Sequence, residues 1–84
     1  MKFHFTKHAR QKFLRMEKAG FTISQKQVKQ SVFHPLKVED RQDATYIAMT
    51  LIDNHHVLRV VYRTESDIII IITFYPGRRK AYEI

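Results

Sequence analysis

The spacing of apolar residues changes along the chain. From Met1 to Phe5 apolar and polar residues alternate, which is the period of a short, half-buried strand. From Lys7 to Phe33 apolar residues recur every three or four positions, which is typical of amphipathic helices. After Pro35 a period close to two returns and continues to Tyr75. The pattern predicts one strand, then helices, then several strands.

The first helix is expected over Lys7 to Ala19. Thr6 is its predicted N-cap, because a threonine hydroxyl can accept a hydrogen bond from a free amide of the first turn. Gly20 supplies the left-handed residue that commonly follows a helix. One face of this helix is apolar and should pack, whereas the other faces are cationic.

A second helix is expected to begin after Ser24. Gln27 stands three residues later and completes a capping box with it. The helix should end near Phe33, because Pro35 pushes the residue before it out of the helical region.

The rest of the chain predicts an antiparallel meander of three or four strands. We expect the helices to cover one face of this sheet, which makes residues 1–84 a single α+β domain of the order β-α-α-β-β-β, with a further strand where Leu36 to Asp40 is extended. The predicted strands are Leu36 to Asp40, Thr45 to Ile52, His56 to Arg63 and Ile68 to Tyr75.

Strand alternation divides the side chains between two faces of the sheet. The face toward the helices is predicted to hold Leu58, Val60 and Tyr62, and from the next strand Ile68, Ile70, Ile72 and Phe74. The opposite face then carries Arg59, Arg63, Thr73 and Tyr75. Equal parity, with a three-residue turn at Glu65 to Asp67, would set Arg59 opposite Thr73, and Val57 opposite Tyr75. The pattern fits a partly covered polar patch, and it also fits an ordinary solvated sheet face.

Charge narrows the class of partner. The 84 residues contain 15 Lys and Arg against 8 Asp and Glu, a net charge of +7, which favours a polyanion such as nucleic acid, and after it an acidic protein. The chain has no cysteine, which excludes disulfides and thiolate metal sites and suits the cytoplasm. The longest apolar run, Ile68 to Ile72, is too short to span a membrane, and we expect no signal peptide.

The first predicted helix carries one candidate general base. His8 lies in the first turn, where the positive end of the helix dipole and Lys7 disfavour the imidazolium, so that a neutral His8 can accept a proton. A solvated surface histidine is the alternative. The cations of this helix are expected to contact a nucleic-acid backbone; they are Lys7, Arg10, Lys12 and Arg15.

The basic tail combines phosphate-seeking charge with an aromatic ring. Arg78, Arg79 and Lys80 precede Tyr82, whose ring can stack on a base, although a charge run is also common on a solvated surface. His55 and His56 have no carboxylate or cysteine at ligand-like spacing, so we expect no metal and no cofactor. There is no phosphate-binding loop, dinucleotide fingerprint, nucleophile elbow or pair of catalytic carboxylates.

Three segments resemble a family of toxins. FTKHARQKF at Phe5 to Phe13, SVFHP at Ser31 to Pro35, and the closing LRVVYRTESDIIIIITFYPGRRKAYEI are similar to the RelE/ParE superfamily, and most to its BrnT-like branch and a related group of small proteins. The resemblance covers nearly the whole chain. It implies a microbial-ribonuclease-like sheet with two N-terminal helices. It also implies the toxin of a toxin–antitoxin pair, with an acidic or DNA-binding antitoxin and the ribosome as further partners.

The leading hypothesis is therefore a metal-independent endoribonuclease toxin, an RNA hydrolase in which the 2′-hydroxyl attacks the adjacent phosphate. His8 is the candidate base or acid, and Arg59 and Arg63 are expected to stabilise the developing charge. Tyr75 is the second proton-transfer or stacking group, and Thr73 orients the substrate. The alternative is a non-catalytic binding protein, which is either an inactive relative or an inhibitor of a partner, as ParE-like members act on gyrase.

Overall fold

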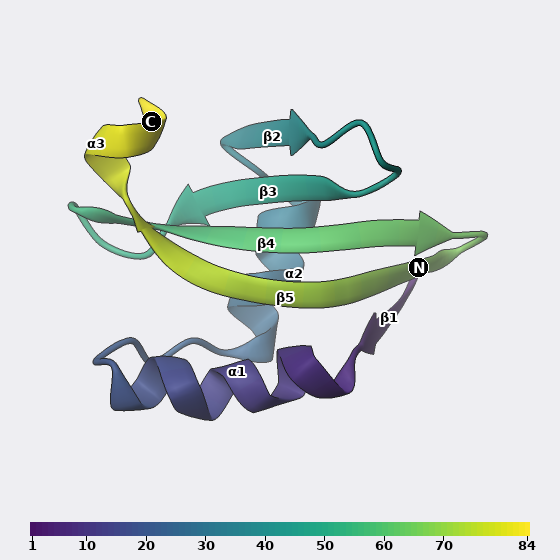
Figure 1. The fold of residues 1–84 in the computed structure, drawn as a ribbon, viewed down its shortest axis with the longest axis horizontal. Coiled ribbons are helices and arrows are strands. Elements are labelled where there is room, and N and C mark those ends of the chain that lie inside the picture. The colour runs from purple at the N-terminus through teal and green to yellow at the C-terminus, as the bar shows by residue number, and fades with distance from the viewer.

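The computed structural model describes residues 1–84 as a five-stranded mixed sheet with three helices (Figure 1). The predicted α+β class is confirmed. None of the helices is long and apolar enough to cross a membrane. In chain order the elements are β1 (Lys2–Phe5), α1 (Lys7–Lys18), α2 (Gln25–Phe33), β2 (Lys37–Asp40), β3 (Tyr46–Leu51), β4 (His56–Glu65), β5 (Ile68–Arg78) and α3 (Arg79–Tyr82).

The strands lie in the order β1-β5-β4-β3-β2. Strands β2 to β5 form an antiparallel meander, whereas β1 pairs in parallel with β5 at the edge of the sheet. The prediction of a purely antiparallel sheet is therefore wrong at β1. The chain leaves β1 into the helices and reaches β5 last, and the amide of Lys2 donates to the carbonyl of Asp67 at 3.1 Å.

Both helix starts follow the predicted capping residues. The amide of Ala9 donates to the Thr6 hydroxyl at 3.1 Å, which satisfies one free donor of the first turn of α1. At α2 the amide of Gln27 donates to Ser24, and the amide of Ser24 donates to the side chain of Gln27, so the capping box is complete. Gly20 has a φ of +96°, as expected for a left-handed residue after a helix.

The main core lies between the helices and one face of the sheet, which we call the inner face. Figure 1 shows α2 crossing behind the strands and α1 running along the β5 side. Ala9 of α1 and Val28 of α2 are fully buried against this face. The predicted inward residues Leu58 and Val60 are buried in the same cluster, together with Phe74.

A β-bulge in β5 overturns part of the predicted face assignment. Thr73 pairs with Val61 and Ile71 with Tyr62, so Ile72 is an extra residue and the alternation of β5 shifts by one position there. On the N-terminal side of the bulge, Ile69 and Ile71 pack in the inner core. The prediction that Ile68, Ile70 and Ile72 face the helices is therefore wrong.

The opposite face of the sheet, the outer face, is covered at one end by the C-terminal segment. This segment, residues 79–84, begins where the amide of Arg79 donates to the carbonyl of His55 at 2.8 Å. Tyr82 and Ile84 pack against a second small cluster formed by Met49 and its neighbours. The other end of the outer face carries no helix.

Candidate nucleic-acid interface

Five polar residues on β1, β4 and β5 lie on the outer face, and we call them the outer-face cluster. Arg59 and Arg63 lie on the same face of β4, with Val61 between them on that face. Tyr75 of β5 lies opposite Arg59. The predicted pairs of Arg59 with Thr73 and Val57 with Tyr75 are wrong, because the turn between β4 and β5 has two residues and the bulge shifts the register by one more. The cluster consists of His4, Arg59, Arg63, Thr73 and Tyr75.

Arg59 is buried in this cluster and already has partners. Its side chain is 8% exposed, and its two terminal nitrogens lie 3.3 and 3.2 Å from the two carboxylate oxygens of Glu39 on β2. Its Nε donates to the Tyr75 hydroxyl at 3.2 Å. The ring of Tyr82 covers the guanidinium at 4.2 Å from the ring centroid. Arg59 therefore anchors β2, β5 and the C-terminal segment to one another.

These contacts stabilise the charged form of the Arg59 side chain. Burial by itself lowers the pKa of the guanidinium, but the hydrogen bonds to Glu39 and Tyr75 outweigh burial and raise the pKa above its ordinary value. The sequence predicts Arg59 on the face opposite the helices as a cation for a substrate, but in the structure it is buried and paired. Its side chain does project from the face opposite the helices, as predicted, but Glu39 and Tyr82 cover it there.

Arg63 and Thr73 differ from Arg59 because each has hydrogen-bonding capacity left over. Arg63 Nε and Thr73 Oγ1 are the two buried side-chain polar atoms that have no hydrogen-bond partner. One terminal nitrogen of Arg63 contacts Glu65 at 3.2 Å, and the Arg63 side chain is 39% exposed. The two residues occupy diagonal positions across β4 and β5, within reach of a long side chain. An unpartnered donor and an unpartnered hydroxyl therefore lie on the same part of the outer face.

The histidine on the outer face is His4, which sequence reasoning missed. His4 pairs with Ile70, and Ile70 pairs with Arg63, so the three form one row across β1, β5 and β4. His4 and Arg63 are two strands apart, which places their Cα atoms about 10 Å from each other. The signal was present in the alternation of β1, where Phe3 and Phe5 pack inward and His4 must face the other way.

His8, the predicted base, lies elsewhere. It is exposed on the first turn of α1, next to Ala9, which packs into the inner core. No hydrogen bond or ion pair joins His8 to a member of the outer-face cluster. The structure brings Arg59, Arg63, Thr73 and Tyr75 together on one face, and it leaves His8 in the helix layer.

The predicted cations of α1 are also in the helix layer. They take part in no ion pair, and all but the half-buried Lys12 are exposed; the four are Lys7, Arg10, Lys12 and Arg15.

The basic tail divides into free and engaged residues. Arg78 and Lys80 are exposed and free of ion pairs. Arg79 is engaged, because its side chain donates to the carbonyls of Ile84 and Asn54. Tyr82 lies on Arg59, so its ring is used in packing. By register Arg78 has the parity of the inner-face residues Leu58 and Phe74, so of the two free cations only Lys80 belongs to the segment that covers the outer face.

The turn before β4 holds the paired histidines. The amide of His55 donates to the Asp53 carboxylate at 2.7 Å, and this bond lowers the pKa of Asp53 below its ordinary value. The ring of His56 lies 3.0 Å from the same carboxylate. No group of three or more histidine, aspartate or glutamate side chains is placed to hold a metal ion.

Comparisons with protein-family models, curated proteins and solved structures find no match to this chain.

Proposed function

We propose that this protein binds RNA through the outer face of its sheet and cleaves it without a metal, as an endoribonuclease toxin. The observation that carries the proposal is the pair of unsatisfied buried groups, Arg63 Nε and Thr73 Oγ1. Buried polar groups in folded proteins almost always have partners, so an unpartnered donor beside an unpartnered hydroxyl indicates a place for a ligand oxygen. A phosphate supplies oxygens that accept from both.

The overall charge supports a nucleic acid as the source of that phosphate. The net charge is +7, and Lys80 is an exposed cation of the segment that covers one end of the same face. Phosphate contacts of this kind position a nucleic-acid backbone without regard to its sequence. We therefore assign Arg63 and Thr73 to the reacting phosphate, and Lys80 and Arg78 to phosphates farther along the strand.

The reaction needs a base, a charge-stabilising group and an acid. In our proposal His4 removes the proton of a 2′-hydroxyl, and the 2′-oxygen attacks the adjacent phosphorus. Arg63 stabilises the negative charge that develops on the phosphate oxygens. The 5′-oxygen leaves and takes a proton from Tyr75, so the products are a 2′,3′-cyclic phosphate and a 5′-hydroxyl. His4 takes the role first expected of His8, because His4 shares a face with Arg63.

The resemblance to RelE/ParE toxins supports the same proposal and extends it to partners. It suggests an antitoxin as cognate partner, the ribosome as a possible site of action, and the cytoplasm as location. The antitoxin would be an acidic segment that masks the outer face, since a cationic surface next to the free edge of β2 suits an extended acidic peptide.

A non-catalytic binding protein is the second candidate, and one observation favours it. Arg59 is neutralised by Glu39 and covered by Tyr82, so only one of the two expected charge-stabilising arginines is available. In this alternative the outer face binds RNA, or a partner protein such as gyrase, without reaction.

The test separates binding from cleavage. Binding of a single-stranded RNA is measured across a range of salt concentrations, and cleavage is followed in EDTA with analysis of the product ends. We expect affinity to fall steeply with salt, and cleavage to leave 2′,3′-cyclic phosphates. Arg63→Ala and Thr73→Val should lose cleavage, while Lys18→Ala, which also removes one exposed cation, should not.

Each other outcome has a clear meaning. Binding without cleavage would support the non-catalytic alternative. Absence of binding at low salt would overturn the nucleic-acid proposal altogether.

A further inference from the structure

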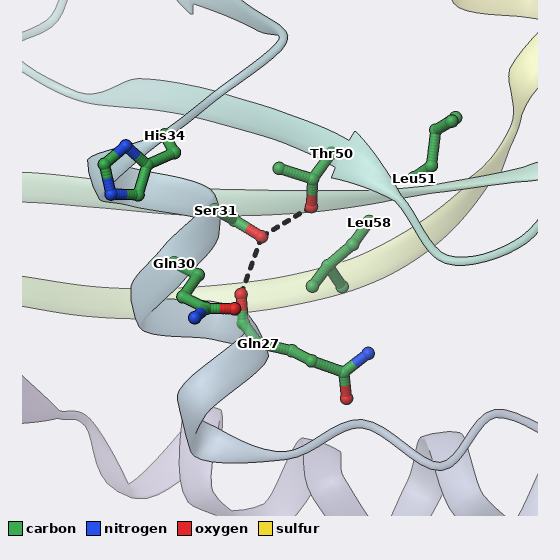
Figure 2. Close-up of a pocket in the computed structure, with 7 residues that line it drawn as sticks. All are labelled: Gln27, Gln30, Ser31, His34, Thr50, Leu51 and Leu58. Carbon is green, nitrogen blue, oxygen red and sulfur yellow. Dashed lines mark hydrogen bonds between the residues drawn. The ribbon is translucent and has the colours of Figure 1, made fainter.

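A pocket of about 490 Å³ lies on the inner side of the sheet, between α2 and β3 (Figure 2). One wall is formed by Gln27 and Gln30 of α2 and by His34, the residue that follows the helix. These residues span two helical turns, about 10 Å of rise. The facing wall includes Thr50 of β3, and Leu58 of β4 is buried at the base. The pocket belongs to neither the outer-face cluster nor the basic tail.

The hydrogen bonds of the two hydroxyl groups in the pocket have a defined donor and acceptor direction. Ser31 donates to the carbonyl of Gln27 at 2.8 Å, and its oxygen lies 2.6 Å from the Thr50 hydroxyl (Figure 2). Because the Ser31 proton is used on Gln27, Thr50 must be the donor to Ser31. The remaining lone pairs of Thr50 Oγ1 can accept a hydrogen bond from a ligand.

The two glutamines offer complementary groups. Gln27 Oε1 accepts from the amide of Ser24 at 2.8 Å, which leaves the Gln27 NH₂ group as a donor. The side chain of Gln30 has no hydrogen bond within the protein, so both its oxygen and its NH₂ group are available in one plane. A planar ligand with an adjacent donor and acceptor can bond to Gln30 at both atoms.

The lining carries no carboxylate, lysine or arginine, although the protein has a net charge of +7. Its polar groups are amides, hydroxyls and the imidazole of His34, and its apolar surface comes from Leu51 and Leu58. A neutral, planar ligand with one apolar face fits this combination. A phosphate or a carboxylate has no cation to pair with here.

We infer that this pocket binds a single unpaired nucleobase that carries an exocyclic amino group, for which adenine is the probe. One amino hydrogen and the adjacent ring nitrogen of adenine can bond to Gln30 at both atoms, and the second amino hydrogen can donate to Thr50 Oγ1. Uracil also offers Gln30 a donor beside an acceptor, but it has no second donor for Thr50. The pocket lies at the end of the sheet where Leu58 pairs with Pro76, two residues before the exposed Arg78. A strand whose phosphates contact Arg78 can therefore place an unpaired base in the pocket. The assignment of RNA as the source of the adenine rests on the proposed function, whereas the adenine site itself does not.

The experiment has two arms. In the first, adenosine and uridine are titrated into the ¹⁵N-labelled protein, and amide shifts of Gln30 and Thr50 are followed. In the second, affinities for an A-rich and a U-rich RNA of equal length are compared. Both arms use Gln30→Leu and Thr50→Val, with Gln25→Leu as the matched control, because Gln25 is an exposed glutamine of α2 outside the pocket. Circular dichroism confirms that every variant is folded.

We expect adenosine, and not uridine, to shift Gln30 and Thr50. Gln30→Leu should weaken adenosine binding about 10-fold or more and remove the preference for A-rich RNA, while Gln25→Leu changes neither. Absence of adenosine shifts at millimolar concentration, or equal loss in Gln25→Leu, would overturn the adenine site. Adenosine binding without any preference for A-rich RNA would overturn RNA as the source. Absence of RNA binding by the unmodified protein would instead overturn the proposed function. The adenosine titration would still show whether the pocket binds the base.

Discussion

Arg59 and Glu39 form a two-point ion pair between β4 and the edge strand β2, with nitrogen–oxygen distances of 3.3 and 3.2 Å. The pair joins strands that are not neighbours, because β3 lies between them. With Tyr82 above the guanidinium, the same pair also fastens the C-terminal segment to the sheet. A residue expected to act on a substrate is thus part of the structural framework.

Removal of Arg59 should therefore destabilise the fold. We expect Arg59→Ala to lower the free energy of unfolding by about 2–3 kcal/mol in urea denaturation, through the lost pair and the space left under Tyr82. The loss stays below that of a fully buried pair, because Glu39 is 37% exposed and water can solvate its carboxylate. Arg63→Ala is the control and should cost about 0.5 kcal/mol or less. Equal stability of the two variants would contradict this role of Arg59.

The proposed chemistry predicts different effects for two histidines. His4→Gln should lower the rate of RNA cleavage about 100-fold or more while leaving RNA affinity nearly unchanged, because it removes a proton-transfer group and no charged phosphate contact. His8→Gln serves as the control, since His8 is also exposed but lies in the helix layer. Cleavage that depends on His8 and not on His4 would show that the wrong histidine has been chosen.

The bulge predicts which isoleucines of β5 matter most. Ile71 is fully buried in the inner core, and Ile71→Ala should cost about 3–5 kcal/mol through the cavity it leaves. Ile70→Ala should cost less, about 1–2 kcal/mol, because Ile70 is on the outer face where no helix packs and the site can relax or admit water. Thermal or urea unfolding measures both. A larger loss at Ile70 than at Ile71 would refute the shifted alternation.

Gly77 should be sensitive because of Tyr82. A Cβ at Gly77 would lie 2.6 Å from a ring carbon of Tyr82 and 3.3 Å from Cδ of Arg59. Gly77→Ala is expected to displace the Tyr82 ring and to destabilise the protein by about 1–2 kcal/mol. In a Tyr82→Ala background most of that cost should disappear, which a double-mutant cycle measures. Additive effects would mean that Tyr82 is not the obstacle.

The sequence alone predicted the local structure well. The helix starts at Thr6 and Ser24 follow from capping hydrogen bonds that span only three residues, and α2 ends at Phe33 before Pro35 as expected. The alternation of apolar and polar residues along β4 also placed Leu58 and Val60 on the face that packs against the helices. Such signals depend on neighbours in the chain, so they can be recognised without knowledge of the fold.

Tertiary structure decided the faces of β5 and the composition of the site. Ile68 to Ile72 is an unbroken isoleucine run, so it carries no alternation that could show which members face the helices, and the bulge arises only when β5 pairs with β4. The parallel pairing of β1 brought His4 to the outer face in the same row as Arg63, with Ile70 between them, and left His8 outside the cluster. Glu39 and Tyr82 reach Arg59 from positions about 20 residues away in the chain. The period of side chains along a strand determines which residues share a face; which face is covered, and by what, depends on contacts between distant segments.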